Sequence, residues 1–423
     1  MGYAGSSAGD FDPASINSGD TAWMLMATAL VMLMTPAVGF FYGGMVSAKN
    51  VVSVLKQSFI ILALVSIQWV IVGYSLVFGT DIKGIIGGMD YFALQGVGYA
   101  PNADYAATIP HLMFMMFQGM FAIITPALII GAFVGRMKFK ALVAFTLLWT
   151  TLVYDPIAHW VWGIGGWLRD SGALDFAGGT VVHMSAGFSA LAAALLIGKR
   201  ITSGHPSSNA NNVPFVILGA VLLWFGWFGF NAGSALGAGA LASGVFVVTN
   251  IAAAASALAW VILSYAENGK PSAMAAAIGA VCGLVSITPA SGYVGPVSAI
   301  AIGLIGGVVT YLAVYWRMHK SSIDDSLDVW AAHGMGGLVG AILTGVFAEK
   351  AVNSFGNDGL LFGNAGLVWT QIVAVLCTAL YAFVATYIIL KVLSMFTPLR
   401  VTSKQEEEGL DIASHGEMGY RLQ

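Results

Sequence analysis

The sequence predicts an all-α polytopic membrane protein, and its composition is the first reason. Of the 423 residues, 58% are hydrophobic and only 9% are charged. Soluble domains carry about 25% charged residues, so this chain has too little charge to cover a surface that faces water. We therefore expect it to lie in a lipid bilayer. A net charge of −3 gives no sign of nucleic-acid binding, and the two cysteines are too few for a disulfide framework or a metal site.

Apolar windows long enough to cross a bilayer are the second reason. A helix rises ~1.5 Å per residue, so about 20 apolar residues span the ~30 Å hydrocarbon layer. The chain has eleven such windows, of which the eighth is rich in alanine. They cover residues 22–42, 52–78, 109–135, 141–162, 177–197, 213–231, 241–265, 272–289, 297–316, 329–347 and 366–396.

The distribution of basic residues orients these windows. Lys83, Arg169 and Lys350 are the only lysines and arginines on one set of alternating loops, and the rest of the 17 lie on the other set. Cytoplasmic loops of membrane proteins carry the excess of basic residues. We therefore expect a protein of the cell membrane, with its N-terminus outside and its C-terminus in the cytoplasm. An odd number of helices agrees with this orientation.

The same orientation predicts an inverted repeat of five plus five helices, followed by a C-terminal helix. The fifth helix then descends from outside, and the tenth rises from the cytoplasm. The expected divisions are an extracellular segment at 1–20, the first repeat at 21–200, the inverted second repeat at 201–350, an outer loop with the eleventh helix at 351–396, and a cytoplasmic tail at 397–423.

Two aspartate–histidine pairs with equal spacing are the strongest functional signal. Seven residues separate Asp175 from His183, and seven separate Asp325 from His333. Each histidine should lie ~12 Å along the helix from its aspartate. Since the two helices enter from opposite faces, both imidazoles should meet near mid-membrane. Ionisable groups at that depth are costly and usually mark a transport path, so we interpret them as a functional pair of neutral rings; the alternative is two separate structural histidines.

The acids near these helices have structural explanations as well. Asp175 and Asp325 each precede a helix, where a carboxylate can cap the free N–H groups. For Asp175, a role in a cation site is an equal alternative. Asp155 lies near the outer end of the fourth window, where it either attracts cations or belongs to a solvated face. Among the other histidines, His111 and His159 suit interfacial hydrogen bonds. Those expected to be solvated on the cytoplasmic side are His205, His319 and His415.

Aromatic residues suggest a binding site for a cation. Ring faces attract a partly desolvated cation without a fixed charge that would trap it. The sequence WFGFNAGS at 227–234 places rings, small residues and the hydroxyl of Ser234 within about two helical turns, and that hydroxyl can accept an N–H hydrogen bond. The alternative is an interfacial belt or lipid-facing bulk. The rings in question are Phe117, Phe121, Trp162, Trp227 and Phe230.

Four motifs together resemble the ammonium transporter family (Amt/Mep/Rh), of the prokaryotic AmtB type. They are DFAGGTVVH at 175–183, GFNAGS at 229–234, DVWAAHG at 328–334, and the tail residues GLD at 409–411 with HGE at 415–417. The resemblance runs over nearly the whole chain, from FYGG at 41–44 to that tail.

This resemblance implies a homotrimer of eleven-helix protomers with one pore in each. It implies no cofactor, and it implies that the tail meets a PII-type (GlnK-like) nitrogen regulator. It also assigns roles to nine side chains: Trp162, Phe121 and Ser234 as the outer ammonium site, Phe117 as its vestibule, Asp175 as its support, Phe121 and Phe230 as a stacked gate, Trp227 below that gate, and His183 and His333 as the twin histidines of the pore.

The resulting functional hypothesis is an ammonium transporter that recruits NH4+, removes a proton and conducts ammonia. An ammonium sensor that signals through its cytoplasmic tail is the alternative. About 27 residues follow the last window, fewer than the ~50 that a signalling domain needs, which favours transport. An intramembrane enzyme is not expected, because the sequence shows no nucleophile–base pair or metal set near the histidines.

Overall fold

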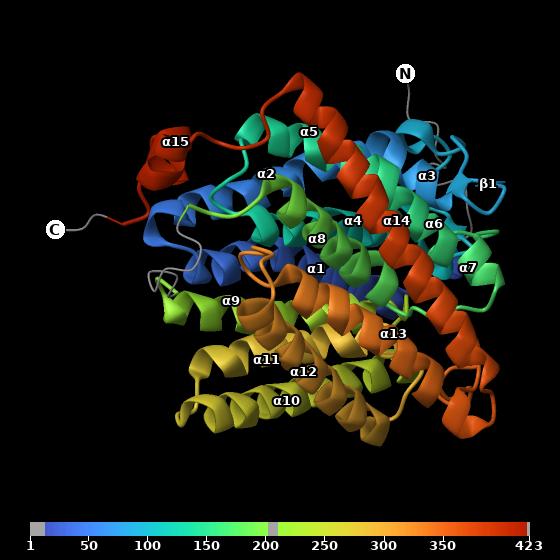
Figure 1. The fold of residues 1–423 in the computed structure, drawn as a ribbon. Helices are drawn as coiled ribbons and strands as arrows, with labels where there is room; N and C mark the ends of the chain where they lie inside the picture. Colours follow the sequence, from blue (N-terminus) through green and yellow to red (C-terminus); the bar gives the residue numbers. More distant parts are fainter. Residues whose placement is uncertain (1–12, 202–209, 421–423) are drawn as a thin grey trace.

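The computed structural model describes residues 13–201 and 210–420, and it is helical almost throughout (Figure 1). The strands of the described residues form two short hairpins. They join β1 (Asp81–Ile82) to β2 (Ile86–Gly87) and β3 (Pro101–Asn102) to β4 (Ala106–Pro110), all antiparallel. Both hairpins lie in the loop before the third long helix. The all-α membrane fold expected from the sequence is confirmed.

The eleven expected windows all form helices, several of them continued by a π-helical segment. The bounds are α1 (Ser18–Met45), α2 (Val51–Gln68) with η3 (Trp69–Gly73) and α3 (Tyr74–Phe78), α4 (His111–Phe133), α5 (Phe139–Trp149) with η5 (Thr150–Tyr154) and α6 (Asp155–Trp162), η6 (Gly179–Met184) with α8 (Ser185–Ile197), α9 (Val213–Trp227) with η8 (Phe228–Ala232), α10 (Ala240–Asn268), α11 (Ala273–Ile287), α12 (Pro296–Lys320), η9 (Trp330–Met335) with α13 (Gly336–Phe347), and α14 (Gly366–Phe396).

Shorter helices occupy the connections and the tail. They are η1 (Pro13–Ser15), η2 (Ala48–Asn50), η4 (Phe92–Leu94), α7 (Trp167–Asp170), η10 (Leu360–Phe362), α15 (Ser403–Glu408) and α16 (Leu410–His415).

The eighth window is the one whose length differs most from the expectation. In the described part of the chain, ten helices are long and apolar enough to cross a membrane, whereas α11 has 15 residues. At ~1.5 Å per residue, α11 covers ~22 Å, less than the hydrocarbon layer. The helix stops at Ile287 because the chain turns through the segment 288–294, which includes Pro289. The other windows agree with the helices to within a few residues at each end.

The two repeats cross each other at the centre of the bundle. Helix α8 contacts η9, and α13 contacts η6, so each fifth helix packs against the start of its counterpart. Helix α1 packs along α9, the first helix of the other repeat, and α10, α11 and α12 form a neighbouring layer. Helix α14 runs diagonally across the outside of the bundle against α8 and α13 (Figure 1).

Glycine makes the central crossing possible. A Cβ atom on Gly187 would lie 2.1 Å from the backbone nitrogen of Gly334, far inside van der Waals contact. A Cβ atom on Gly337 would lie 2.6 Å from the carbonyl oxygen of Gly179 and 3.1 Å from the Cβ of His183. Because small residues let membrane helices approach closely, these positions allow the two halves to meet next to the histidines.

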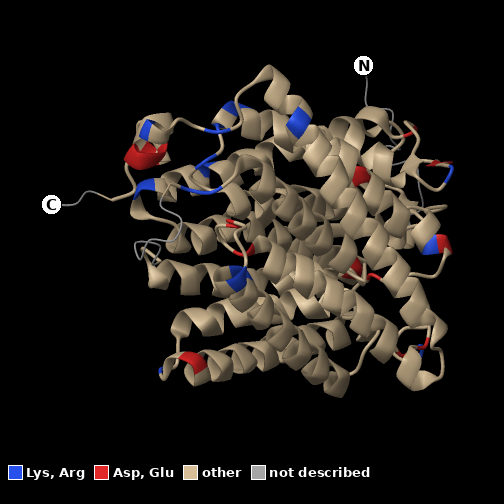
Figure 2. Cartoon of the chain, viewed as in Figure 1, with Lys and Arg blue, Asp and Glu red and all other residues tan. Residues whose placement is uncertain are grey.

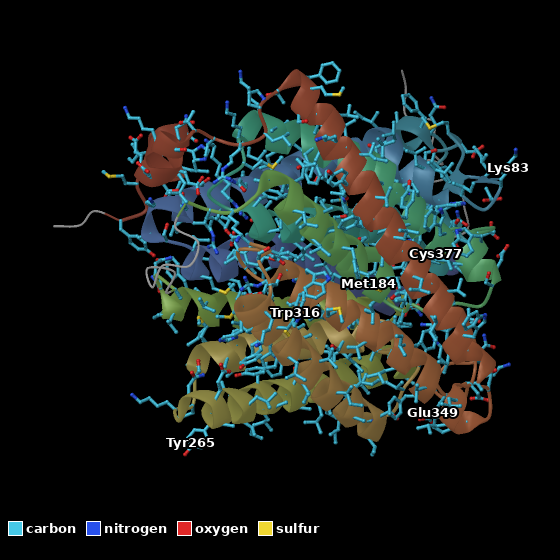
Figure 3. All side chains as sticks on the ribbon, in the orientation of Figure 1. Lys83, Met184, Tyr265, Trp316, Glu349 and Cys377 are labelled. Carbon is cyan, nitrogen blue, oxygen red and sulfur yellow. The ribbon has the colours of Figure 1, made fainter. Side chains whose placement is uncertain are left out.

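Most charged residues lie toward the two ends of the bundle, and the lysines and arginines are concentrated at the end that carries the tail helix α15 (Figure 2). Met184, the neighbour of His183, lies between the end marked by Tyr265 and the end marked by Lys83 and Glu349 (Figure 3). The histidine segment of the first repeat is therefore in the interior, away from both charged ends.

Candidate functional site

The two histidines predicted to meet lie side by side. Their Nδ1 atoms are 3.3 Å apart, and their ring centroids are 5.4 Å apart with planes inclined by 26°. His183 belongs to η6 and His333 to η9, and they are 1% and 5% exposed. In a hydrogen bond between the two rings, one Nδ1–H is the donor and the other Nδ1 is the acceptor. The ring that accepts carries no proton on its Nδ1, so at least this ring is neutral. Each ring can then present its Nε2 to whatever lies beside the pair.

A narrow cavity of about 10 Å³ runs beside this pair. That volume is close to the space one water-sized molecule needs. Except for the histidines and the hydroxyl of Tyr42, the lining is apolar: Met34, Val38, Phe41, Tyr42, Ile124, Leu128, His183, Leu223, Trp227, Phe230, Val281 and His333. The Nε2 atom of His183 is buried and has no hydrogen-bond partner among the described residues. It is therefore available to a small polar molecule in the cavity.

Two rings of the second repeat hold His183 in place. The His183 ring stacks on Phe230 at 5.8 Å with an angle of 21°, and on Trp227 at 5.3 Å with an angle of 26°. The indole nitrogen of Trp227 donates to the hydroxyl of Thr288 at 2.9 Å, which fixes the indole in turn. The resemblance implied a place for Trp227 below the gate, and the structure packs its ring against His183. Its anchor Thr288 was not found from the sequence.

A column of aromatic rings leads away from the histidines. Phe121 lies 4.4 Å from Phe230 between centroids, 5.0 Å from Phe117 and 5.8 Å from Trp162. Phe117, Phe121 and Phe230 are buried, and Trp162 is half-buried. The lipid-facing alternative for Trp227 and the three phenylalanines is therefore wrong. They pack against one another inside the helix bundle.

Ser234 stands beside this column with its oxygen available. Its hydroxyl donates to the carbonyl of Phe230 at 2.9 Å, so the oxygen's lone pairs remain free to accept an N–H bond. The turn after Ser234 is held from helix α1, because the carboxylate of Asp20 accepts the backbone N–H of Ala238 at 2.7 Å. Leu236, within this turn, has a positive φ of 57°. Asp20 was not singled out from the sequence, since nothing in its own surroundings connects it to residue 234.

Asp175 caps the helix segment that carries His183. Its carboxylate accepts the backbone N–H groups of Gly178, Gly179, Thr180 and Val181, and also the hydroxyl of Thr180. The capping explanation is the one the geometry supports. Both carboxylate oxygens are occupied by donors, which leaves a cation little to bind. The carbonyl oxygen of Asp175 accepts the indole N–H of Trp162 at 3.0 Å, so the residue also positions that ring.

Asp325 plays a similar but weaker part at the other end. It accepts the backbone N–H of Trp330 at 2.7 Å at the start of η9, and its second oxygen has no partner in the described chain. The neighbouring Asp324 forms ion pairs with Arg136 and Arg200 at 3.2 and 2.7 Å. These pairs join the loop before η9 to the ends of α4 and α8.

Asp155 differs from its expected surroundings. It is 0% exposed, so the expectation of a solvated face is wrong. The amide of Gln68 on α2 donates to its carboxyl at 2.8 Å, because the fourth membrane helix packs this turn against α2. His111 and His159, which were expected to form interfacial hydrogen bonds, are buried and hydrogen-bonded. His111 contacts the hydroxyl of Tyr74, and His159 hydrogen-bonds Val77 and Asp81.

The tail is bound to the start of α2 and to the segment that follows α8. The carboxylate of Asp411 accepts the N–H groups of Val52 and Ser53 at 3.0 and 2.7 Å, at the start of α2. Glu406 accepts the N–H of Ile201 and pairs with Arg400 at 2.7 Å. These contacts leave α16 docked under α2.

His415 is half-buried against Ser53, so the expectation that it is solvated is wrong. Burial and the nearby charge of Lys56 lower the pKa of His415 below its usual value. Burial raises the pKa of Asp411, against the opposing effect of its backbone hydrogen bonds. His319 is exposed on α12 as expected, and His205 lies outside the described residues.

In the described ranges no group of three or more His, Cys, Asp or Glu side chains is placed to hold a metal ion. The arrangement is thus one of a multi-pass membrane protein with a small, mostly apolar cavity, a pair of imidazoles beside it and a column of rings next to them. These features are those of a membrane transport protein.

Comparison with known proteins identifies the family. The model of the Ammonium Transporter Family matches residues 22–420, and the chain belongs to this family. The curated ammonium transporter of Bacillus subtilis (strain 168) is 49% identical over 403 residues, which cover 95% of this chain and 98% of that protein.

Solved structures agree with this assignment. Candida albicans Mep2 is 34% identical with a TM-score of 0.89, over 95% of this chain and 90% of the Mep2 chain. A structure named Sensor Amt Protein is 31% identical with a TM-score of 0.86, over 94% and 98% of the two chains. The same fold is therefore found in proteins of both names.

Proposed function

We propose that this protein moves ammonium across a cell membrane by binding NH4+ on the outer side, removing its proton and conducting ammonia past the two histidines. The contact between His183 and His333 in a buried apolar cavity is the observation that carries this proposal. A pore for a metal ion would need several oxygen ligands to replace the hydration shell. Two neutral imidazoles instead suit a small neutral molecule with both donor and acceptor capacity.

Recruitment takes place at the outer end of the ring column. The half-buried indole of Trp162 and the face of Phe121 attract a cation, and the free lone pairs of Ser234 accept one of its N–H bonds. Phe117 lines the approach. Asp175 supports this site indirectly, because its carbonyl holds the Trp162 indole and its carboxylate caps the helix behind it.

Loss of the proton lowers the energy barrier to crossing the membrane and also provides the selectivity against potassium. An isolated charge in a low-dielectric interior costs many kcal/mol, whereas neutral ammonia costs only the loss of its hydrogen bonds. The potassium ion is similar to ammonium in charge and size but has no proton to release. It is therefore stopped where the rings close the path.

Passage of ammonia requires only small side-chain motions. Phe121 and Phe230 are in contact, and Phe230 lines the cavity. Rotation of these two rings is the motion that the proposal requires. Below them, the Nε2 atom of His183 offers a hydrogen-bonding partner in an otherwise apolar passage. This combination replaces part of the hydration that ammonia loses on entry.

For assembly and orientation we propose the arrangement that the sequence predicts. We infer a homotrimer in which each protomer has its own pore, with the N-terminus outside and the tail in the cytoplasm. We infer that a PII-type regulator binds at the cytoplasmic face and contacts the docked tail there. The alternative is an ammonium sensor that signals through its tail. Removal of residues 403–420 distinguishes the two functions. A transporter should keep its ammonium current without the tail, whereas a sensor should lose its signal.

Ammonium-evoked current from proteoliposomes on a solid-supported membrane tests the recruitment step. Ser234→Ala should raise the ammonium concentration for half-maximal current about tenfold, because it removes one hydrogen bond to a charged group worth ~1.5 kcal/mol. Ser243→Ala, an exposed hydroxyl near the start of α10, is the matched control and should change nothing. An unaltered half-maximal concentration in Ser234→Ala would remove this residue from the outer site.

A further inference from the structure

Asp155 is a buried acid that the transport path does not use. It follows α5 and η5 in the fourth membrane helix, about 24 Å along the axis from Phe139 at ~1.5 Å per residue. It is therefore within the hydrocarbon layer. Its side chain is 0% exposed. Among the described residues, no lysine, arginine or histidine forms an ion pair with it.

The partners of Asp155 leave two acceptor atoms without a donor. The Nε2 group of Gln68 donates to Asp155 Oδ2 at 2.8 Å and to Thr151 Oγ1 at 3.2 Å. The other carboxyl oxygen, Asp155 Oδ1, and the amide oxygen, Gln68 Oε1, are both buried and have no partner within the described chain. Buried polar atoms of this kind are normally satisfied, so the pair lacks one donor.

One proton supplies that donor. If Asp155 Oδ1 carries a hydrogen, it can donate to Gln68 Oε1 while Gln68 Nε2 donates to Oδ2, which closes a ring of two hydrogen bonds between an acid and an amide. The same proton removes the negative charge, whose burial in a membrane without a counter-ion is costly. The preceding residue in the chain, Tyr154, carries a titratable phenol that is also buried.

The backbone around this pair is irregular in the same way as around the candidate pore. The π-helical segment η3 begins directly after Gln68, and η5 ends directly before Asp155. The two segments contact each other. The other π-helical segments carry His183, Phe230 and His333. Single π-helical turns inside α-helices are frequently found at functional sites.

We propose that Asp155 and Gln68 form a proton-binding site within the membrane, separate from the histidine pair. The ligand is a proton, held on Asp155 Oδ1 at neutral pH and shared with the amide oxygen of Gln68. The carboxyl is the group that exchanges the proton, and Gln68 positions it. This site does not depend on the route of ammonium, because it rests on Asp155, Gln68 and the helices that hold them.

Infrared spectroscopy of the full-length protein in lipid at pH 7 tests the site. Wild type should show the carbonyl band of a protonated carboxylic acid, and Asp155→Asn should lose that band. Asp104→Asn, which removes an exposed loop carboxylate, is the control and should reduce only the carboxylate bands. Absence of the acid band in wild type, or its survival in Asp155→Asn, would overturn the proposal.

Two further measurements keep the test informative if Asp155→Asn folds poorly. Gln68→Leu retains the acid but removes its partner, so the carbonyl band should move to higher frequency; an unmoved band would exclude the acid–amide pair. Adding ammonium or sodium to wild type at constant pH should leave the band in place. If either cation converts it to a carboxylate band, the site binds a cation rather than a proton.

Discussion

Replacing Asp175 by asparagine tests whether this acid is a helix cap or a ligand for the cation. The carboxylate accepts four backbone N–H groups and the hydroxyl of Thr180. An amide keeps one acceptor oxygen and turns two N–H donors toward the remaining backbone donors. At least two hydrogen bonds to a charged acceptor are lost, each worth ~1.5–3 kcal/mol, so Asp175→Asn should destabilise the protein by about 3–6 kcal/mol.

Asp325→Asn is the matched control, because Asp325 occupies the corresponding position in the second repeat but accepts one backbone N–H and has one oxygen without a partner. Its amide can keep that bond, so we expect a loss of about 1 kcal/mol or less. The assay is the temperature at which each detergent-solubilised variant loses its monodisperse elution peak, read beside the half-maximal ammonium concentration. Equal stability of the two variants, with only the ammonium concentration shifted in Asp175→Asn, would refute the cap and favour a direct ligand.

Two other predictions concern packing and pH. Gly187→Ala should lower the free energy of unfolding by ~1–3 kcal/mol and reduce the ammonium current, because its Cβ would force α8 away from Gly334 and separate the histidines. Gly244→Ala is the control, because its Cβ would meet no atom within 4 Å. It should be neutral or stabilising in the same unfolding and current measurements. The lowered pKa of His415 means that the docked tail favours the neutral ring, so docking is fully favourable above the unperturbed pKa of ~6.5 and weakens as pH falls through it. Amide hydrogen exchange of residues 410–415 should therefore be slower at pH 7.5 than at pH 6 after correction for intrinsic rates, and a profile without this difference, or one unchanged by His415→Ala, would contradict the coupling.

The fold could be predicted from the sequence because two simple regularities control it. Apolar length gives the helices, and the spacing of Asp175–His183 and Asp325–His333 gives the depth at which the halves meet. These two regularities and the inverted order of the repeats predict imidazoles at one depth, and the structure places their Nδ1 atoms 3.3 Å apart. The length of α11 was overestimated because hydropathy does not respond to the turn that begins near Pro289.

Other features depend on contacts between residues far apart in the chain. Asp155 is enclosed because α2 packs Gln68 against it, 87 residues away, and no local pattern announces that partner. The same holds for the docked tail, where Asp411 caps a helix that begins 360 residues earlier at Val51. Acidic side chains near a helix end or in a tail are usually exposed, and the sequence around these two acids shows nothing that would predict their burial. Tertiary packing then decided their surroundings.

Ammonium current with a potassium control in variants of the paired histidines tests the transport proposal most directly. His183→Ala and His333→Ala, each reconstituted in liposomes, should lower the ammonium-evoked current or admit potassium, because each removes a polar edge from the cavity and breaks the Nδ1 contact. His319→Ala, on the exposed end of α12, should behave like wild type. If both variants of the pair keep the wild-type ammonium current and still exclude potassium, the two imidazoles do not take part in conduction or selection.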